Sequence, residues 1–149
     1  MDNNPINPAL QNMQNFIGTW EMELSNASFL PDPATNISGI ANFEWFEGGD
    51  FLILRQGTKN KAPWATWFIG HDKDFPNYTV LYLDDQQSSR VYEMSYENGV
   101  WKMWRNSPGF RQRFEAKVSE DKKTITGYWE NSTDGKTWKH DFDLRYAKI

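Results

Sequence analysis

The sequence predicts an all-β protein, an up-and-down antiparallel barrel of about ten strands with one short helix before it. Between residues 37 and 146, runs of aromatic and β-branched residues are separated by short turns, and no helical pattern interrupts them. Asn98-Gly99 favours the positive φ angles of a type I′ hairpin turn, and Asp134-Gly135 is a second hairpin signal. A series of about ten strands twists too strongly to stay flat, and closure removes its exposed edges, so a barrel is expected. The alternative is a two-sheet sandwich, which normally needs longer crossing connections.

The first element is expected to be a short helix that covers one mouth of the barrel. Asn7 can cap the free N–H groups of this helix, and Pro8 suits its first position. Gly18 ends the helical pattern. Its apolar stripe consists of Leu10, Met13, Phe16 and Ile17.

Alternation of apolar and polar residues predicts the strands. The first strand, residues 19–24, is followed by a long loop over residues 26–36, which contains Pro31 and Pro33 and is a candidate lid. Further strands are expected over residues 37–46, 51–57, 64–70, 78–83, 91–97, 100–105, 110–118, 124–131 and 140–146. The chain is therefore expected to be one barrel domain over residues 1–149, with an N-terminal segment over 1–17 and the barrel over 18–149.

Length, charge and cysteine content narrow the function classes. A chain of 149 residues can bury a sizeable core as one domain, and it contains no cysteine that could form a disulfide. The net charge of −4 disfavours a nucleic-acid partner. The start MDNNPINPAL lacks the features of a signal peptide, and no apolar run is long enough to span a membrane, so a cytoplasmic protein without a membrane partner is expected. The sequence leaves the oligomeric state open, a homodimer included.

Aromatic residues are frequent, with ten Phe, eight Trp and six Tyr. Such side chains fill β-protein cores, and they also line ligand pockets. We expect the barrel to bind a small, largely apolar molecule with a carboxylate or similar polar end, which Arg55 or Arg105 would hold by charge-assisted hydrogen bonds. Arg90 is a further arginine for the interior, and the alternative for these side chains is an internal ion pair or a position at the barrel rim. The residues expected to contact the ligand are Trp20, Arg55, Tyr92, Trp101, Arg105, Gln112, Trp129, His140 and Phe142.

A small barrel enzyme is the second function class. His140 alternates with Phe142 on the last strand, so its side chain is expected to point into the barrel, where it could donate or accept a proton. Arg105 would stabilise developing negative charge, and Tyr92 or Tyr82 would donate a hydrogen bond. Because no nucleophile motif, phosphate-binding loop or HExxH is present, proton transfer or cyclisation is the expected reaction type. Two isolated histidines and no cysteine argue against a metal site.

Several segments carry a resemblance to known barrels. The segment FIGTW (residues 16–20) resembles the start of calycin-type barrels, in which a helix or turn leads into a Gly-x-Trp first strand. Residues 47–52, 90–92, 101–105, 108–110 and 129–135 are similar to segments of a family of uncharacterised bacterial lipocalin-like proteins. The resemblance covers nearly the whole chain from residue 16 and implies a lipocalin-like barrel, without an established activity.

The resemblance also raises heme as a cofactor. Nitrobindins, a heme-binding branch of such barrels, share the Gly-x-Trp opening and place a heme-ligating histidine on the final strand. His140 is the residue of this chain at that place. After Trp20, however, this chain reads Glu-Met-Glu where the nitrobindin motif continues with small residues and glycine. We therefore expect no cofactor and a colourless protein, with nitrobindin-like heme binding as the alternative.

Overall fold

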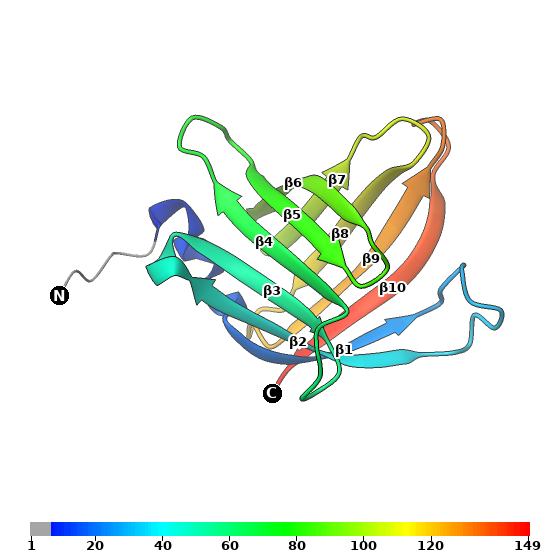
Figure 1. The fold of residues 1–149 in the computed structure, drawn as a ribbon, viewed down its shortest axis with the longest axis horizontal. Coiled ribbons are helices and arrows are strands. Elements are labelled where there is room, and N and C mark those ends of the chain that lie inside the picture. The colour runs from blue at the N-terminus through cyan, green and yellow to red at the C-terminus, as the bar shows by residue number, and fades with distance from the viewer. Residues whose placement is uncertain (1–6) are drawn as a thin grey trace.

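Ten antiparallel strands run in sequence order around a closed barrel (Figure 1). The structure is a computed structural model and describes residues 7–149; residues 1–6, the start of the expected N-terminal segment, lie outside the described residues. The strands are β1 (Gly18–Ser25), β2 (Ile37–Phe46), β3 (Phe51–Gly57), β4 (Ala65–His71), β5 (Tyr78–Asp84), β6 (Ser89–Glu97), β7 (Val100–Arg105), β8 (Arg111–Val118), β9 (Thr124–Ser132) and β10 (Lys139–Lys148). Each strand pairs with the next, and β1 also pairs with β10. The predicted barrel is confirmed, and the sandwich is excluded because all ten described strands form one closed sheet.

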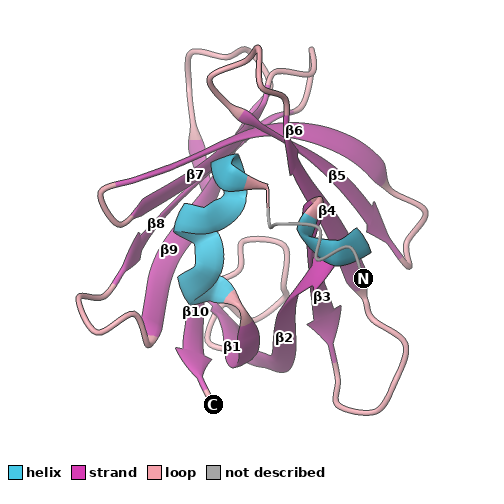
Figure 2. Cartoon of the chain, turned by 90° about the vertical axis from the view of Figure 1, so that its left-hand side faces the viewer, coloured by secondary structure: helices cyan, strands magenta, loops and turns pink. Residues whose placement is uncertain are grey.

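The helix η1 (Pro8–Phe16) covers one mouth of the barrel (Figure 2). It is a 3-10 helix, and the Asn7 side chain caps it by accepting a hydrogen bond from the Ala9 N–H at 3.0 Å. The Tyr78 hydroxyl lies 2.8 Å from both Ala9 O and Asn12 Oδ1, which ties the helix to β5. The predicted apolar stripe is buried at Leu10, Met13 and Phe16. Neither η1 nor the one-turn helix η2 (Glu47–Gly49) is long and apolar enough to cross a membrane.

Aromatic rings fill the half of the barrel next to η1. The centroid of the Phe16 ring lies 5.4, 5.0 and 5.3 Å from those of Phe43, Tyr96 and Trp101. The Trp101 ring in turn lies 4.9 Å from the Phe114 ring, almost edge-on. Such edge-to-face pairs stabilise the fold beyond the area that they bury. This half of the barrel is a packed core.

A β-bulge in β10 changes which residues face the interior. In the pairing with β9, His140 lies opposite Glu130 and Phe142 lies opposite Trp129, so Asp141 is an extra residue between the two pairs. Trp129 is buried inside the barrel, whereas Glu130 lies with an arginine partner on the outer face. His140 therefore points outward. The expectation that it shares the inner face with Phe142 was wrong, because the bulge interrupts the alternation.

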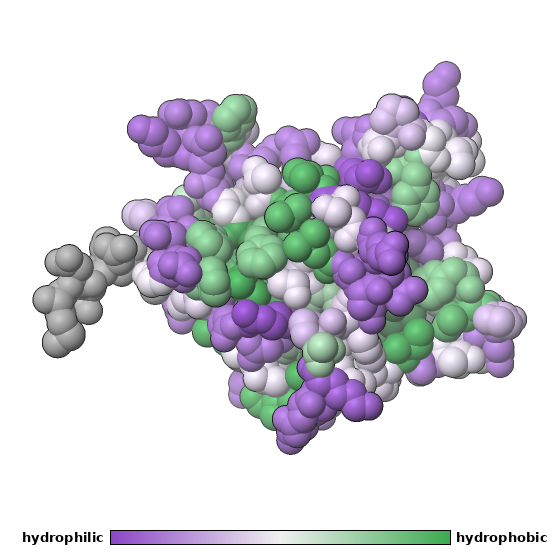
Figure 3. All heavy atoms as spheres, in the orientation of Figure 1, coloured by the Kyte–Doolittle hydropathy of each residue, from purple (hydrophilic) through white to green (hydrophobic). Residues whose placement is uncertain are grey.

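Apolar side chains also gather over the middle of the outer face shown in Figure 3, between charged residues. On the outer face of the sheet, Leu81 on β5 and Val91 on β6 are cross-strand partners, and they are 38% and 59% exposed. Both alternate along their strands with residues that face the interior, Val80 and Tyr92. Leu81 and Val91 are therefore separated from the barrel interior by the thickness of the sheet.

Candidate functional site

The half of the barrel away from η1 contains an open cavity of about 410 Å³, which we call the mouth cavity. Its aromatic walls are formed by Trp64, Trp67, Tyr82, Tyr92, Phe110, Trp129 and Phe142. Its aliphatic lining comes from Met22, Leu24, Ile37, Ala65 and Leu144. The polar lining consists of Gln56, Asp84, Asp85, Gln86, Arg90, Gln112 and Asp141. An aromatic cavity with a few convergent polar groups is typical of a small-molecule site.

Three neighbouring side chains form the main polar cluster, which we call the Arg90 cluster: Arg90, Tyr92 and Gln112. The Tyr92 hydroxyl donates a hydrogen bond of 2.6 Å to Gln112 Oε1, and Arg90 Nη1 approaches the same oxygen at 3.4 Å. The Arg90 guanidinium also lies over the Phe110 ring, 5.4 Å from its centroid. Burial raises the pKa of Tyr92 above that of free tyrosine, so its hydroxyl stays protonated at neutral pH. The cluster therefore presents hydrogen-bond donors and one positive charge to the cavity.

A second polar group, Tyr82 with Asp84, lies where β5 enters its turn. The Tyr82 hydroxyl donates to Asp84 Oδ2 at 2.8 Å, and burial together with this carboxylate raises the pKa of Tyr82. Asp84 Oδ1 accepts from the N–H groups of Gln86 at 3.0 Å and Ser88 at 2.8 Å. Partial burial raises the pKa of Asp84, but these hydrogen bonds and that of Tyr82 outweigh it, and the pKa is lowered. Asp84 is therefore ionised at neutral pH and held by the protein itself.

A third network fixes the orientation of one cavity wall. Trp67 Nε1 donates to Gln56 Oε1 at 2.8 Å, and Gln56 Nε2 donates to the Tyr146 hydroxyl at 2.6 Å. Tyr146 is 1% exposed, and this burial raises the pKa of its hydroxyl. Since both ends of the Gln56 amide are engaged within the protein, its role is to hold the Trp67 ring in place.

The aromatic walls are arranged as roughly parallel faces. The rings of Trp67 and Trp129 have centroids 6.1 Å apart and an interplanar angle of 29°. The rings of Trp129 and Phe142 have centroids 6.3 Å apart and the same interplanar angle. Tyr92 meets Trp129 at 73°, which closes one edge of the wall. Three rings of the wall, those of Trp67, Trp129 and Phe142, are therefore close to parallel, and the Tyr92 ring is set across them.

The structure brings four of the predicted contact residues to the mouth cavity. These are Tyr92, Gln112, Trp129 and Phe142, and the candidate Tyr82 joins them. Each lies on the inward-facing side of its strand, as alternation predicts. These five residues therefore line one cavity, which is the place where a ligand could bind.

The other five predicted contact residues lie elsewhere, and one of them, His140, points outward from β10. Trp20 and Trp101 are fully buried in the packed half beside η1 and do not line the cavity. Arg55 lies on the outer face of β3, where it forms an ion pair with Glu44. Arg105 sits at the rim and reaches the Phe110 carbonyl at 3.4 Å. Of the arginines considered for the interior, Arg90 is the one that lines the cavity.

The four candidate catalytic residues are not gathered at one place. Tyr82 and Tyr92 line the mouth cavity, Arg105 lies at its rim, and His140 is on the outer face with a side chain 46% exposed. The nearest charged partner of His140 is Asp143, whose Oδ1 lies 3.4 Å from Nε2. Within residues 7–149, no three His, Cys, Asp or Glu side chains are grouped so that they could hold a metal ion. The proton-transfer arrangement expected from the sequence is therefore not assembled.

Sequence reasoning missed Trp67 and left Arg90 out of the expected contacts. Arg90 precedes Tyr92 by two residues on β6, and Trp67 holds the equivalent inward position on β4. Alternation could have placed both side chains inside the barrel. Alternation could not have shown that Arg90 and Trp67 line the mouth cavity and not the packed half beside η1.

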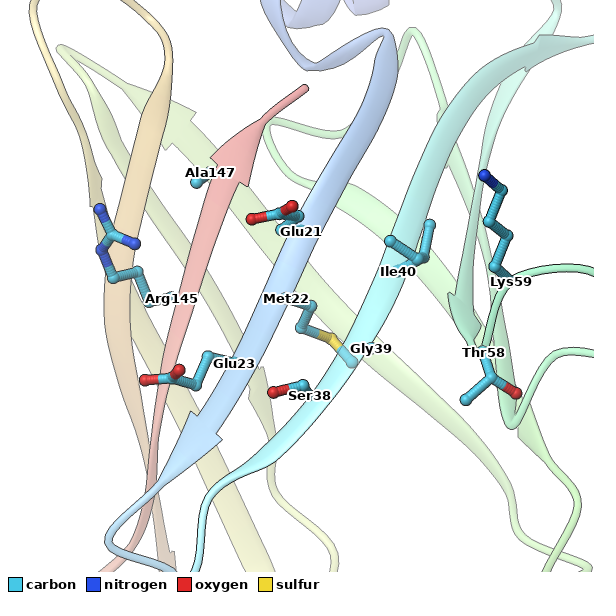
Figure 4. Close-up of a pocket in the computed structure, with 10 residues that line it drawn as sticks. All are labelled: Glu21, Met22, Glu23, Ser38, Gly39, Ile40, Thr58, Lys59, Arg145 and Ala147. Carbon is cyan, nitrogen blue, oxygen red and sulfur yellow. The ribbon is translucent and has the colours of Figure 1, made fainter.

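A second hollow of about 470 Å³ lies on the outside of β1 and β2 (Figure 4). Glu21, Glu23 and Lys59 border it as exposed side chains, and they spread apart rather than converge on one point. Met22 forms its base, where Gly39 has no side chain. The charged side chains around this hollow are solvated, so a ligand bound there would bury little apolar surface. The mouth cavity, with its aromatic walls, is the better candidate site.

Comparisons with known proteins support the fold. No protein-family model matches the chain, and no curated protein matches its sequence. Among solved structures, the crystal structure of Rv2717c from M. tuberculosis is similar, with a TM-score of 0.60 over 97% of this chain and 99% of that chain. The two chains are 11% identical, so the similarity concerns the fold alone.

Proposed function

We propose that this protein is a calycin-type, lipocalin-like barrel of the cytoplasm that binds a small, largely apolar molecule through an anionic end, such as a carboxylate. The mouth cavity supplies aromatic walls for the apolar part. The Arg90 cluster supplies the donors for the anionic end. The absence of cysteine supports the reducing compartment.

Arg90 is the observation that carries this proposal. Its side chain lines the cavity, and it is not a member of any ion pair within residues 7–149. A guanidinium has five N–H donors in a planar fork, and its contacts here are the Phe110 ring and one long approach to Gln112. A partly desolvated guanidinium is stabilised by a carboxylate, which it can bind through two parallel hydrogen bonds. A carboxylate ligand would supply that partner.

Carboxylates at the rim raise the opposite possibility, a cationic ligand. Asp84 already accepts hydrogen bonds from Tyr82 and from two backbone N–H groups. Asp85 Oδ1 accepts from Gln86 Nε2, and Asp141 Oδ1 accepts from the Ser28 hydroxyl, both at 3.2 Å. These acceptors are engaged within the protein, whereas Arg90 keeps free donors. The balance therefore favours an anionic ligand end.

A series of ligands with one skeleton and different ends tests the proposal. Isothermal titration calorimetry would compare 2-naphthoate, 2-naphthalenemethanol and 2-naphthylmethylammonium. We expect the acid to bind roughly 10- to 100-fold more tightly than the alcohol, because hydrogen bonds between charged groups contribute about 1.5–3 kcal/mol. Equal binding of acid and alcohol, or tighter binding of the ammonium compound, would contradict the proposal.

Heme does not fit this site through the predicted ligand. His140 lies on the outer face of β10, and neither histidine of the chain lines the mouth cavity. We therefore expect added hemin to give no sharp Soret band that depends on His140. Absorption spectra of the wild type, His140→Ala and the control His71→Ala test this expectation. A stoichiometric band lost in His140→Ala alone would show that it is wrong.

A further inference from the structure

We propose that the ligand of the mouth cavity is a flat aromatic carboxylate of one or two fused rings, not a long-chain fatty acid. This inference rests on the proposed function and specifies the apolar part of the ligand. Two features carry it: the depth of the cavity and the orientation of its walls.

The cavity is shallow because the barrel is packed solid beneath it. The Trp129 ring, which lines the cavity, lies 5.0 Å from the Phe114 ring, and Phe114 lies 4.9 Å from Trp101. Trp101 then meets Phe16 of η1 at 5.3 Å, so rings in contact extend from the cavity to the helix. Phe114, Trp101 and Phe16 are each at most 2% exposed, and none of them lines the cavity. An extended alkyl chain therefore cannot continue along the barrel axis.

The walls suit a flat molecule. Trp129 lies within 29° of parallel to both Trp67 and Phe142, so these three wall rings share one orientation, with which the plane of a flat ligand can align. Aromatic rings gain from stacked and edge-to-face contacts in addition to the area that they bury, whereas an alkyl chain gains only from burial. The wall from β1 and β10 is formed by Met22, Leu24 and Leu144, which carry no polar group. A planar ring in the cavity would therefore meet aromatic side chains on one side and aliphatic groups on the other.

The position of the Arg90 cluster sets the orientation of this ligand. Arg90 lies nearer the open end of β6 than Tyr92, and its guanidinium contacts Phe110, which is 39% exposed at the rim. Gln112 Oε1 is already an acceptor, and within residues 7–149 its Nε2 makes no hydrogen bond, so Nε2 is available to donate. The carboxylate would thus bind Arg90 and Gln112 Nε2 near the rim, with the ring below it against Trp67 and Trp129.

Two acids with the same number of carbon atoms separate a ring from a chain. Apolar area alone favours undecanoate over 2-naphthoate, because its flexible chain buries more methylene groups. We expect isothermal titration calorimetry to show the reverse, with 2-naphthoate bound roughly tenfold more tightly. Trp129→Leu is expected to weaken 2-naphthoate several-fold and to change undecanoate little. Phe142→Leu, at the half-buried edge of the wall, provides the same comparison if Trp129→Leu does not fold.

The outcomes distinguish this inference from the proposed function. Tighter binding of 2-naphthoate that is lost on removal of the Trp129 or Phe142 ring would support the inference. Undecanoate binding as tightly or more tightly, and requiring Arg90, would overturn the inference while supporting the anionic ligand. Failure of both acids to bind would overturn both.

Discussion

Arg90→Gln is expected to weaken the binding of 2-naphthoate roughly 10- to 100-fold, since it removes a charge-assisted bidentate contact. Arg90 is half-buried in the cavity wall and has no ion-pair partner within residues 7–149, so the substitution leaves no unpaired carboxylate behind. Glutamine keeps much of the side-chain length and can still donate one hydrogen bond. The expected loss therefore reflects the guanidinium rather than a collapsed cavity. Calorimetry and circular dichroism on the same samples would measure affinity and folding together.

Arg55→Gln and Arg105→Gln are matched controls for this prediction. Arg55 forms its ion pair with Glu44 on the outer face, and Arg105 lies at the rim without lining the cavity. Both controls remove one positive charge, so they measure the general effect of charge on an anionic ligand. We expect each to change affinity less than about threefold, because exposed charges are screened by salt. A loss in Arg55→Gln equal to that in Arg90→Gln would show that the site is not specific.

The barrel could be predicted from the sequence because its turns are encoded locally. Asn98 and Gly99 have φ angles of 52° and 76°, the positive values that the type I′ turn requires. The neighbouring strands pair on either side of this turn, with Glu97 opposite Val100. The connections from β2 onward are all short, which leaves each strand beside the next, and closure follows from the number of strands. The order of the strands therefore follows from residues that lie close together in the sequence.

The site was less predictable because it depends on features beyond alternation. A single extra residue, Asp141, places His140 on the outside, and nothing in the residue pattern marks the bulge. Arg55 was expected inside the barrel because it follows an apolar run. One residue of that run, Ile53, is buried although it faces outward, and Arg55 lies on the same outer face. Alternation placed Trp101 and Trp129 correctly inside the barrel. Which of them meets the cavity depends on the helix that covers one end.

Phe16→Ala is expected to lower the free energy of unfolding by about 3–5 kcal/mol, the usual cost of removing a fully buried phenylalanine. Phe16 is 1% exposed and is the residue through which η1 contacts three rings of the core. The cavity left by alanine is bordered by Phe43, Tyr96 and Trp101, which are held by β2, β6 and β7 and cannot all move inward. Urea unfolding followed by tryptophan fluorescence would measure the change.

Phe75→Ala is the control for this substitution. Phe75 is 65% exposed in the turn between β4 and β5, so its replacement is expected to change the free energy of unfolding by less than about 0.5 kcal/mol. The affinity of folded Phe16→Ala for 2-naphthoate is expected to stay near that of the wild type, because Phe16 lies in the packed half and does not line the mouth cavity. A cost below about 1 kcal/mol would mean that η1 is not an integral part of the core. A large loss of affinity in the folded variant would mean that the two halves of the barrel are coupled, because the packed rings position the floor beneath Trp129.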